Sequence, residues 1–453
     1  MTVRPRLAPT RGELREMLGL ATPIVVVNLG MMLQGAVDTI MLGHASSTAL
    51  AAGALGNLYF FNVIVVGMGM LMSLDPIVAQ ALGARDADGA ARGVQRGVIL
   101  AVLTAVLGAA CMMPAGAVLK FLNQPADVID GAAAYARWSA LGIIPWQLFS
   151  AFRQTLQAMH RVLPMAVAVI IANLVNALLA WIFVFGKFGV PAMGVVGAAH
   201  ATWISRWLMV VLIVWLSWKD LRPMLIPWRR ESLALRPLWR MIVLGTPIGL
   251  QWFAEGFAFG FSGIAIGWLG AETLAGHQIT LTMASLTFMV PMGVAGAGAA
   301  MVGRAIGAGD VPAARRAALA ALTCGVGFMS AMAIFMIALP GELSRVFTRE
   351  AVTIGIAAAL VPIAGVFQVF DGTQVVASAI LRGTGDTRVP MILHVLSFWA
   401  FGIPLGLVLA FTLKFGAPGM WWGLTAGLAA AAVLQLARVR MMLRRDITRV
   451  VVD

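Results

Sequence analysis

The sequence predicts an all-α polytopic membrane protein with twelve transmembrane helices in two six-helix bundles related by an internal repeat. Three observations support this fold class: the composition, the spacing of apolar runs and the similarity of the two halves. Of the 453 residues, 60% are hydrophobic and 11% are charged, and the mean hydropathy is +0.91. Soluble domains carry about 25% charged residues, so the composition excludes a soluble globular protein.

Runs of about 20 apolar residues are long enough to cross the hydrocarbon core of a bilayer. Breaks that are charged or rich in Gly and Pro separate twelve such runs in this chain. Their expected limits are 14–42, 51–80, 93–118, 128–152, 160–185, 193–217, 237–268, 276–302, 316–340, 352–381, 388–412 and 417–441. Several runs exceed the minimum length, so their helices can tilt. Pro23 and Pro247 each remove a backbone hydrogen bond within a run and favour a kink.

The formal net charge of +13 is unevenly distributed along the chain. Most of the 32 Lys and Arg residues lie near the two chain ends or in the loops that follow even-numbered spans. The positive-inside rule places these segments in the cytoplasm. We therefore expect a multi-pass protein of the inner (plasma) membrane with both termini cytoplasmic, and a first span that acts as an uncleaved signal anchor. The lipid bilayer is the expected partner of this charge pattern, and nucleic acid is not.

The two halves of the chain share short segments in the same order. The matching pairs are ATP at 21–23 with GTP at 245–247, ALGARD at 81–86 with AIGAGD at 305–310, and KFGVP at 187–191 with KFGAP at 414–418. Each half holds an even number of spans, so both enter the membrane in the same orientation. Parallel repeats of this kind are typical of transporters, with substrate sites near the bilayer midplane.

We divide the chain into an N-terminal bundle at 1–218, a cytoplasmic linker at 219–236 and a C-terminal bundle at 237–453. The linker region is rich in Arg and Pro. It offers a hinge for alternating access between the two bundles.

Three carboxylates, Asp38, Glu255 and Asp371, lie inside predicted spans. An aspartate at the centre of a membrane helix costs about 2.5 to 3.5 kcal/mol, so such residues usually mark an ion or substrate pathway. None of the three has an acidic counterpart in the other half. Arg206 and Arg137 are the only cations expected well inside a span, and structural ion pairing is the alternative for each acid. Because burial disfavours the charged form, we expect the acids to be protonated or to hold a cation.

Polar side chains accompany the acids at helical spacing. The candidate supporting residues are Gln34 before Asp38, Gln251 before Glu255, Gln368 and Gln374 around Asp371, Gln278 in the eighth span, and Asn173 and Asn176 in the fifth. Polar faces in lipid must contact protein or water. Hydrogen bonding between helices is the alternative for the amides. Trp421 and Trp422 lie near a predicted outer boundary, and we interpret them as interfacial residues.

Four segments carry a resemblance to a known family. They are VDTIMLGH at 37–44, EGF at 255–257, HQI at 277–279 and DGTQVVASAILRGTGDTRVP at 371–390. With its twelve spans and six-plus-six repeat, the chain resembles multidrug and toxic compound extrusion (MATE) transporters, and most closely their NorM-like branch. Members of that family are antiporters that expel organic, often cationic and lipophilic compounds, driven by inward flow of Na⁺ or H⁺.

The resemblance implies a role for each candidate residue. Glu255 and Asp371 would form the coupling-cation site, which could hold Na⁺, and Gln278 would lie near a drug-facing surface. Asp38 would handle protons or substrate in the N-terminal half, with Asn173 and Asn176 as its polar neighbourhood. The resemblance implies a cation-coupled antiporter for organic compounds, with no catalytic residues and no cofactor besides the coupling ion. Carboxylates serve either ion, so the choice between Na⁺ and H⁺ stays open.

Other functions fit the residues less well. A lipid-linked oligosaccharide flippase of the same broad superfamily is the nearest alternative, but its pyrophosphate substrate would require several cavity-facing Arg or Lys residues. A membrane-embedded enzyme is a different class. The five His residues form no HExxH motif or other close set of metal ligands. A passive channel is a further alternative, against which the asymmetric acids indicate coupling.

Overall fold

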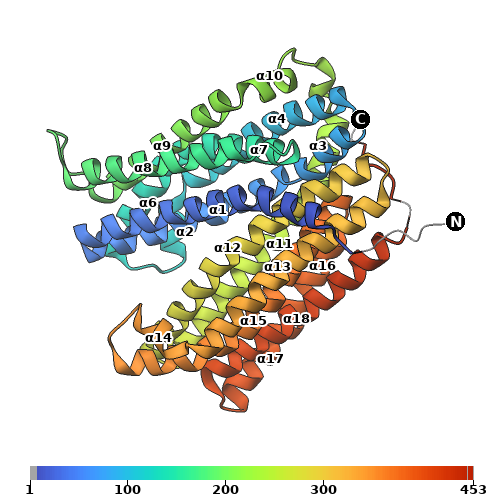
Figure 1. Ribbon diagram of the computed structural model, residues 1–453. Helices are drawn as coiled ribbons and strands as arrows, with labels where there is room; N and C mark the ends of the chain where they lie inside the picture. Colours follow the sequence, from blue (N-terminus) through green and yellow to red (C-terminus); the bar gives the residue numbers. More distant parts are fainter. Residues whose placement is uncertain (1–7, 446, 452–453) are drawn as a thin grey trace. The chain divides into compact units, whose positions relative to one another are not determined.

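The computed structural model describes residues 8–445 and 447–451, and within these residues the only regular secondary structure is helical (Figure 1). The elements are α1 (Arg11–Ala45), α2 (Ser47–Leu71), α3 (Leu74–Gly83), α4 (Ala87–Met112), α5 (Ala115–Phe121), α6 (Ala126–Ser139), η1 (Ala140–Gly142), α7 (Ile143–Ala158), α8 (Leu163–Phe185), α9 (Gly194–Leu216), α10 (Trp218–Leu225), η2 (Arg230–Leu233), α11 (Leu235–Gly267), α12 (Ala271–Gly307), α13 (Val311–Ala338), α14 (Pro340–Arg345), α15 (Ala351–Thr384), α16 (Arg388–Val395), η3 (Leu396–Gly402), α17 (Ile403–Leu407), η4 (Val408–Thr412) and α18 (Gly416–Met442).

The helices confirm the multi-pass membrane prediction. Ten helical stretches of the described chain are long and apolar enough to cross a membrane. The other two predicted spans correspond to α6 and α7, which the short turn η1 separates, and to α11. The fourth predicted span is thus divided between two helices. Helix α11 is long enough to cross, but it carries the polar residues Gln251 and Glu255.

Contacts divide the chain into two compact units. We call Val26–Gly249 the N-unit, which also takes in Val451, and Leu250–Val450 together with the residues up to Val25 the C-unit. These boundaries differ from the halves expected from sequence at two helices. The first turns of α1 belong to the C-unit, and the first half of α11 belongs to the N-unit.

Close backbone approach explains this exchange of helix segments. A Cβ atom on Gly69 of α2 would lie 2.1 Å from the Cα of Gly249 of α11, so the two helices touch through their backbones in the N-unit. In the C-unit, a Cβ atom on Gly293 of α12 would lie 3.0 Å from the backbone nitrogen of Val25 of α1. The repeat alignment of ALGARD with AIGAGD relates Gly69 to Gly293 and Val25 to Gly249. The same helix crossing therefore occurs once in each unit.

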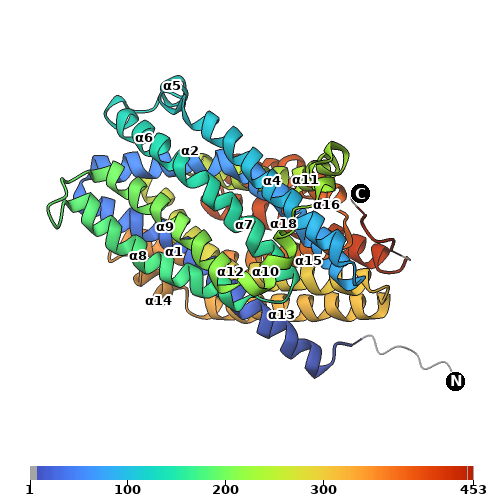
Figure 2. The same ribbon diagram turned by 90° about the horizontal axis from the view of Figure 1, so that it is seen from above.

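Each unit has its own packing arrangement. In the C-unit, α15 lies against α12, α13 and α18, and its core includes the buried side chains of Phe367, Phe398 and Trp421. In the N-unit, α8 packs along α9 and α4 along α7, as Figure 2 shows. Both bundles thus bury apolar side chains around central helices, and polar groups on those helices need a protein partner or water.

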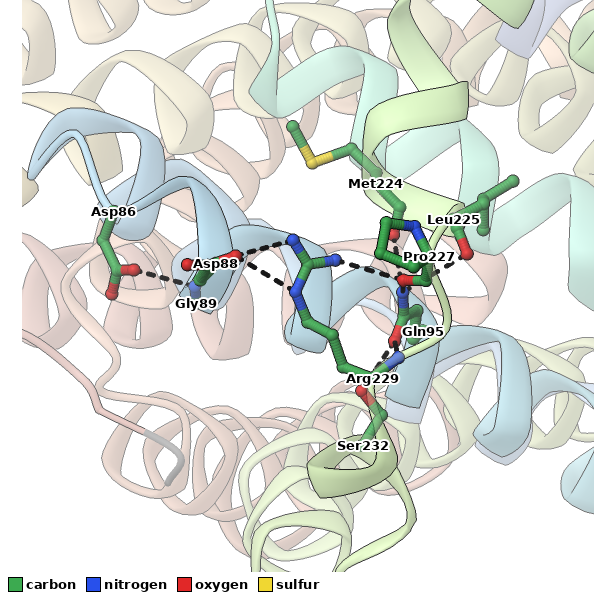
Figure 3. Close-up of polar contacts among 9 residues, drawn as sticks. All are labelled: Asp86, Asp88, Gly89, Gln95, Met224, Leu225, Pro227, Arg229 and Ser232. Carbon is green, nitrogen blue, oxygen red and sulfur yellow. Dashed lines mark hydrogen bonds and ion pairs between the residues drawn. The ribbon is translucent and has the colours of Figure 1, made fainter.

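The segment that follows α10 is held to α4 by the buried side chain of Gln95 (Figure 3). Its amide nitrogen donates to three carbonyls at the end of α10 and just beyond it, those of Met224 at 3.1 Å, Leu225 at 3.3 Å and Pro227 at 3.0 Å. Its amide oxygen accepts from the backbone N–H of Arg229 at 2.9 Å and the hydroxyl of Ser232 at 2.8 Å. One glutamine thus satisfies five polar groups of the linker.

Two arginines add to this attachment. The Arg229 guanidinium lies 2.6 Å from the carboxylate of Asp88, and Arg96 donates to the carbonyl of Glu231 at 3.0 Å. Asp88 and Arg96 both belong to α4. These bonds join residues 224–232 of the expected hinge region, between Trp218 and Pro237, to α4 of the N-unit.

Replacement of Gln95 by Leu should destabilise the protein and release the linker. The change leaves buried carbonyls and an N–H without partners, at a cost of about 1 to 3 kcal/mol for each buried group left unsatisfied. We expect a lower melting temperature of the purified protein and faster tryptic cleavage after Arg229 and Arg230. Gln124→Leu is the control, since Gln124 bonds only to the nearby carbonyl of Leu122. Equal melting and cleavage in the two variants would contradict the anchoring role of Gln95.

Candidate functional site

The three acids lie in two different units. Asp38 belongs to the part of α1 in the N-unit, and Glu255 of α11 and Asp371 of α15 belong to the C-unit. We call the acids of the C-unit and their polar neighbours the C-cluster (Glu255, Asp371, Gln374, His394). We call the acid of the N-unit and its polar neighbours the N-cluster (Asp38, Asn176, Thr202, Arg206).

The C-cluster joins three helices. The Glu255 carboxylate oxygen Oε2 lies 3.5 Å from Nε2 of His394 on α16, and Nδ1 of His394 lies 3.0 Å from the amide nitrogen of Gln374 on α15. Asp371 lies one helix turn before Gln374, and its charge interacts with that of Glu255. The structure thus brings three of the candidate residues from the sequence, Glu255, Asp371 and Gln374, into one cluster.

Burial differs between the two acids of the C-cluster. The Glu255 side chain is 19% exposed, whereas Asp371 is 6% exposed and its Oδ1 atom has no hydrogen-bond partner among the described residues. No Lys or Arg in the described part of the chain forms an ion pair with either acid. Two interacting carboxylates without a fixed cation would repel each other when both are charged, so binding of a proton or a cation stabilises this arrangement.

His394 lies between Glu255 and Gln374 in the C-cluster. With the Gln374 amide donating to Nδ1, the proton of the neutral imidazole is on Nε2, the nitrogen that faces Glu255. The His394 side chain is fully buried. A neutral, oriented imidazole leaves the two carboxylates as the charged groups of the cluster. Sequence reasoning missed His394, because the histidines were considered only as metal ligands and its partners Glu255 and Gln374 lie on other helices.

The other glutamines of the C-unit bond across helices. Gln251 donates to Ser378 at 3.1 Å, which links α11 to α15, and Gln368 accepts from Thr287 of α12 at 2.7 Å. These bonds fit the alternative of helix-to-helix hydrogen bonding for the amides. The Gln278 side chain is exposed on α12. It is therefore accessible on the surface of its unit.

The interfacial interpretation of Trp421 is wrong. Its side chain is fully buried, and its indole N–H donates to Nδ1 of His277 at 3.2 Å. Its ring meets that of Phe367 edge-on, with centroids 5.5 Å apart. Trp422, in contrast, is 45% exposed. Successive residues of α18 point about 100° apart around the helix axis, so neighbouring tryptophans can differ in burial, which position along the span alone does not reveal.

The N-cluster surrounds Asp38. The hydroxyl of Thr202 on α9 donates to Oδ2 of Asp38 at 2.6 Å, and the amide nitrogen of Asn176 on α8 lies 3.5 Å from the same hydroxyl. Oδ1 of Asp38 and the side-chain oxygen of Asn176 are buried without hydrogen-bond partners among the described residues. The buried Gln34 amide nitrogen is also unpartnered within that part of the chain. Polar atoms are thus available beside Asp38.

Arg206 supplies the N-cluster with a buried cation. Its guanidinium lies over the rings of Phe60, at 4.3 Å, and Trp146, at 4.8 Å, and its charge attracts that of Asp38. Such cation–π contacts stabilise a guanidinium away from water. Arg206 lies one helix turn after Thr202, so both reach the cluster from the same face of α9. The N-cluster therefore has a charge balance that the C-cluster lacks.

Two further polar contacts complete the N-unit. Asn173 donates to the carbonyl of Gly30 at 2.6 Å, which ties α8 to α1 and leaves Asn176 as the amide nearer Asp38. Arg153 is buried and donates to Asn28 of α1 at 3.1 Å. Sequence reasoning did not identify Arg153 as a buried cation because the fourth span was ended at residue 152, whereas α7 continues to Ala158.

Helices of transmembrane length, a repeated bundle and buried ionisable clusters within the spans define a multi-pass membrane transporter. The family model MatE matches residues 23–182 and 247–408, so the chain belongs to the MatE family. Its members are transporters and not enzymes, which confirms the prediction that this chain has no catalytic activity.

Named relatives are similar over nearly the whole chain. The "Probable multidrug resistance protein NorM" of Mesorhizobium japonicum is 36% identical over 96% of this chain and 95% of its own length. The "Multidrug resistance protein MdtK" of Edwardsiella ictaluri is 31% identical over 96% of both chains.

Solved structures confirm the fold class of twelve helices in two bundles. The eukaryotic MATE transporter AtDTX14 has a TM-score of 0.86 at 22% identity and covers 95% of this chain and 96% of its own. An outward-facing MATE family transporter of the MOP superfamily has a TM-score of 0.87 at 21% identity, over 96% of this chain and 98% of its own.

Replacement of Thr202 by Val should destabilise the N-unit. The change keeps the shape of the side chain but removes the hydroxyl that donates to Asp38, and loss of a partner for a buried polar group costs about 1 to 3 kcal/mol. We expect a lower melting temperature of the purified transporter. Thr155→Val is the matched control, because the equally buried Thr155 bonds only to the Ala151 carbonyl of its own helix. A larger loss in the control would show that the bond to Asp38 contributes little.

Proposed function

We propose that this protein is a cation-coupled antiporter, driven by Na⁺ or H⁺, that exports organic, cationic and lipophilic compounds by alternating access. The observation that carries the proposal is the C-cluster, where Glu255 and Asp371 interact without a described Lys or Arg partner. The names of the relatives, multidrug resistance proteins, support organic drugs as the exported class. The composition and the excess of Lys and Arg in alternate loops support an inner-membrane location with both termini cytoplasmic.

The coupling ion acts by removing the repulsion between two carboxylates. A cation that enters from outside neutralises Glu255 and Asp371 and favours the conformation in which drug is bound weakly and released. Drug that binds from the cytoplasmic side favours release of the cation. Each ligand shifts the equilibrium only through its differential affinity for the two conformations.

Either ion is compatible with the residues of the C-cluster. A proton binds to one of the carboxylates directly. Na⁺ is a hard cation that takes oxygen ligands, which the carboxylates of Glu255 and Asp371 supply, with amide or backbone oxygens and water to complete the set. The described residues contain no group of three or more His, Cys, Asp or Glu side chains that could hold a metal ion. This composition favours a weakly held, exchangeable ion over a permanently bound metal.

The N-cluster and the exposed polar residues are our candidates for the substrate side. Asp38, with Gln34 and Asn176 beside it, carries buried polar atoms that lack partners in the described chain, and such atoms gain most from a ligand or proton. Asn173 supports this face of α8 through its bond to Gly30. Gln278 and the glutamines Gln251 and Gln368 are candidates for contacts with drug on the C-unit.

Removal of either acid of the C-cluster should uncouple transport. With the protein in liposomes that contain a fluorescent cationic dye, we expect Glu255→Gln and Asp371→Asn to reduce gradient-driven dye efflux by about 10-fold or more, because the ion then loses its differential affinity. Glu272→Gln is the matched control, since Glu272 is an exposed acid in the first turn of α12. Efflux at the wild-type rate in both cluster variants would remove these residues from the coupling site.

Separate gradients identify the ion and test the antiport itself. An inward Na⁺ gradient at equal pH, or an inward H⁺ gradient without sodium, should drive efflux by the wild-type protein. Asp38→Asn should impair transport under the same gradient, because it removes the charge opposite Arg206. If neither gradient stimulates dye efflux, the antiporter proposal is rejected.

A further inference from the structure

A groove of about 480 Å³ lies between α13 and α18 of the C-unit, away from the acids discussed above. Apolar residues, among them Leu319, Leu322 and Leu436, line it together with Arg315, Arg440 and Arg444. Apolar pockets with a few convergent polar groups are typical of ligand sites. The coupling and transport residues do not line this groove.

Helical spacing directs these residues to one place. Arg315, Leu319 and Leu322 follow at intervals of four and three on α13, and Leu436, Arg440 and Leu443 follow at the same intervals on α18. The Nε atom of Arg315 donates to the Leu443 carbonyl at 2.6 Å, which joins the start of α13 to the residue that follows α18. The groove is therefore cationic at this end, and its apolar part extends along the helices.

The arginines of the groove differ from their neighbours in their partners. Arg316, next to Arg315, pairs with Glu13 at 2.6 Å, and Arg438 pairs with Asp386 at 2.7 Å. Among the residues that the structure describes, no carboxylate pairs with Arg315 or Arg440. Arg444, which follows α18, likewise has no acidic partner within those residues. Three arginines that line the groove thus have no carboxylate partner among the described residues.

We propose that this groove binds an anionic phospholipid of the surrounding bilayer, with its phosphate at Arg315, Arg440 and Arg444 and an acyl chain along the apolar part. Guanidinium groups match the oxygens of a phosphate with paired hydrogen bonds. Basic pockets between transmembrane helices on the cytoplasmic side are suited to acidic lipid headgroups. The cytoplasmic location of this groove rests on the membrane orientation given under the proposed function. The cationic substrates proposed above are poor occupants, because three positive charges repel them.

Lipid binding by the purified full-length transporter in detergent tests the assignment. We would titrate it with phosphatidylglycerol or with phosphatidylcholine of the same acyl chains, and count bound lipids by native mass spectrometry. The wild type should bind one phosphatidylglycerol in preference to phosphatidylcholine. The double variant Arg440→Gln with Arg444→Gln should weaken that binding by about 10-fold, since each basic residue near an acidic lipid contributes to the attraction.

A matched double variant separates the groove from general surface charge. Arg316→Gln with Arg438→Gln removes the same charge from the same ends of α13 and α18 and should change lipid affinity by less than about 2-fold, because those arginines pair with carboxylates. Leu322→Trp should fill the apolar part and reduce binding while it retains every arginine. Arg440→Lys with Arg444→Lys should retain most of the preference, which covers the case in which the Gln variants fail to fold.

Three results would overturn the assignment. They are equal binding of the two lipids by the wild type, equal loss in the two Gln double variants, and binding of a cationic dye that the groove variants abolish. The last result would identify a drug site. Lipid binding needs no ion gradient and no efflux, so a failure of the antiporter proposal in liposomes would leave this measurement unaffected, and the reverse also holds.

Discussion

The cost of a carboxylate inside an apolar helix is the constraint on which the two candidate sites depend. Each such group needs a hydrogen-bond donor, an opposite charge or a bound ion. The N-unit meets this need with protein groups, because Thr202 donates to Asp38 and Arg206 attracts it. The C-unit gathers Glu255 and Asp371 near an imidazole and an amide, and neither acid has a Lys or Arg partner among the described residues. Described protein groups thus balance the charge at one site, and the other is the site at which we propose an exchangeable cation.

Two of the three acids, Asp38 and Glu255, lie on helices that are divided between the units. Helix α1 begins in the C-unit and carries Asp38 in the N-unit, whereas α11 begins in the N-unit and carries Glu255 in the C-unit. The glycine contacts at Gly69 and Gly293 fix the first part of each helix to its unit. If either helix moves near its acid, the movement is therefore transmitted along the helix to its first part, which packs in the other unit.

The sequence predicted the fold class because composition and span length are properties of single segments. Periodicity also grouped each acid with polar side chains on one face of its own helix, and the roles of these residues stay predictions. Partners on other helices were harder to predict. Thr202 and His394 contact their acids across 164 and 139 positions of the sequence, and no helical spacing encodes such a pairing. Gln95 was likewise missed, because a glutamine near the start of a predicted span gives no sign that a distant linker supplies its partners.

The linker at 219–236 belongs to the N-unit, so the chain passes from one unit to the other at different positions. Residues 224–232 are bonded to α4, and the first half of α11 packs on α2 through Gly249. The remaining connections within the described helices are the passages of α1 beyond Val25 and of α11 beyond Gly249. Each follows a proline by two residues, Pro23 in α1 and Pro247 in α11. A proline inside a helix removes a backbone hydrogen bond and eases bending. The repeat has therefore placed a proline just before each of these two positions. Pro23 lies 15 residues before Asp38, and Pro247 lies 8 residues before Glu255.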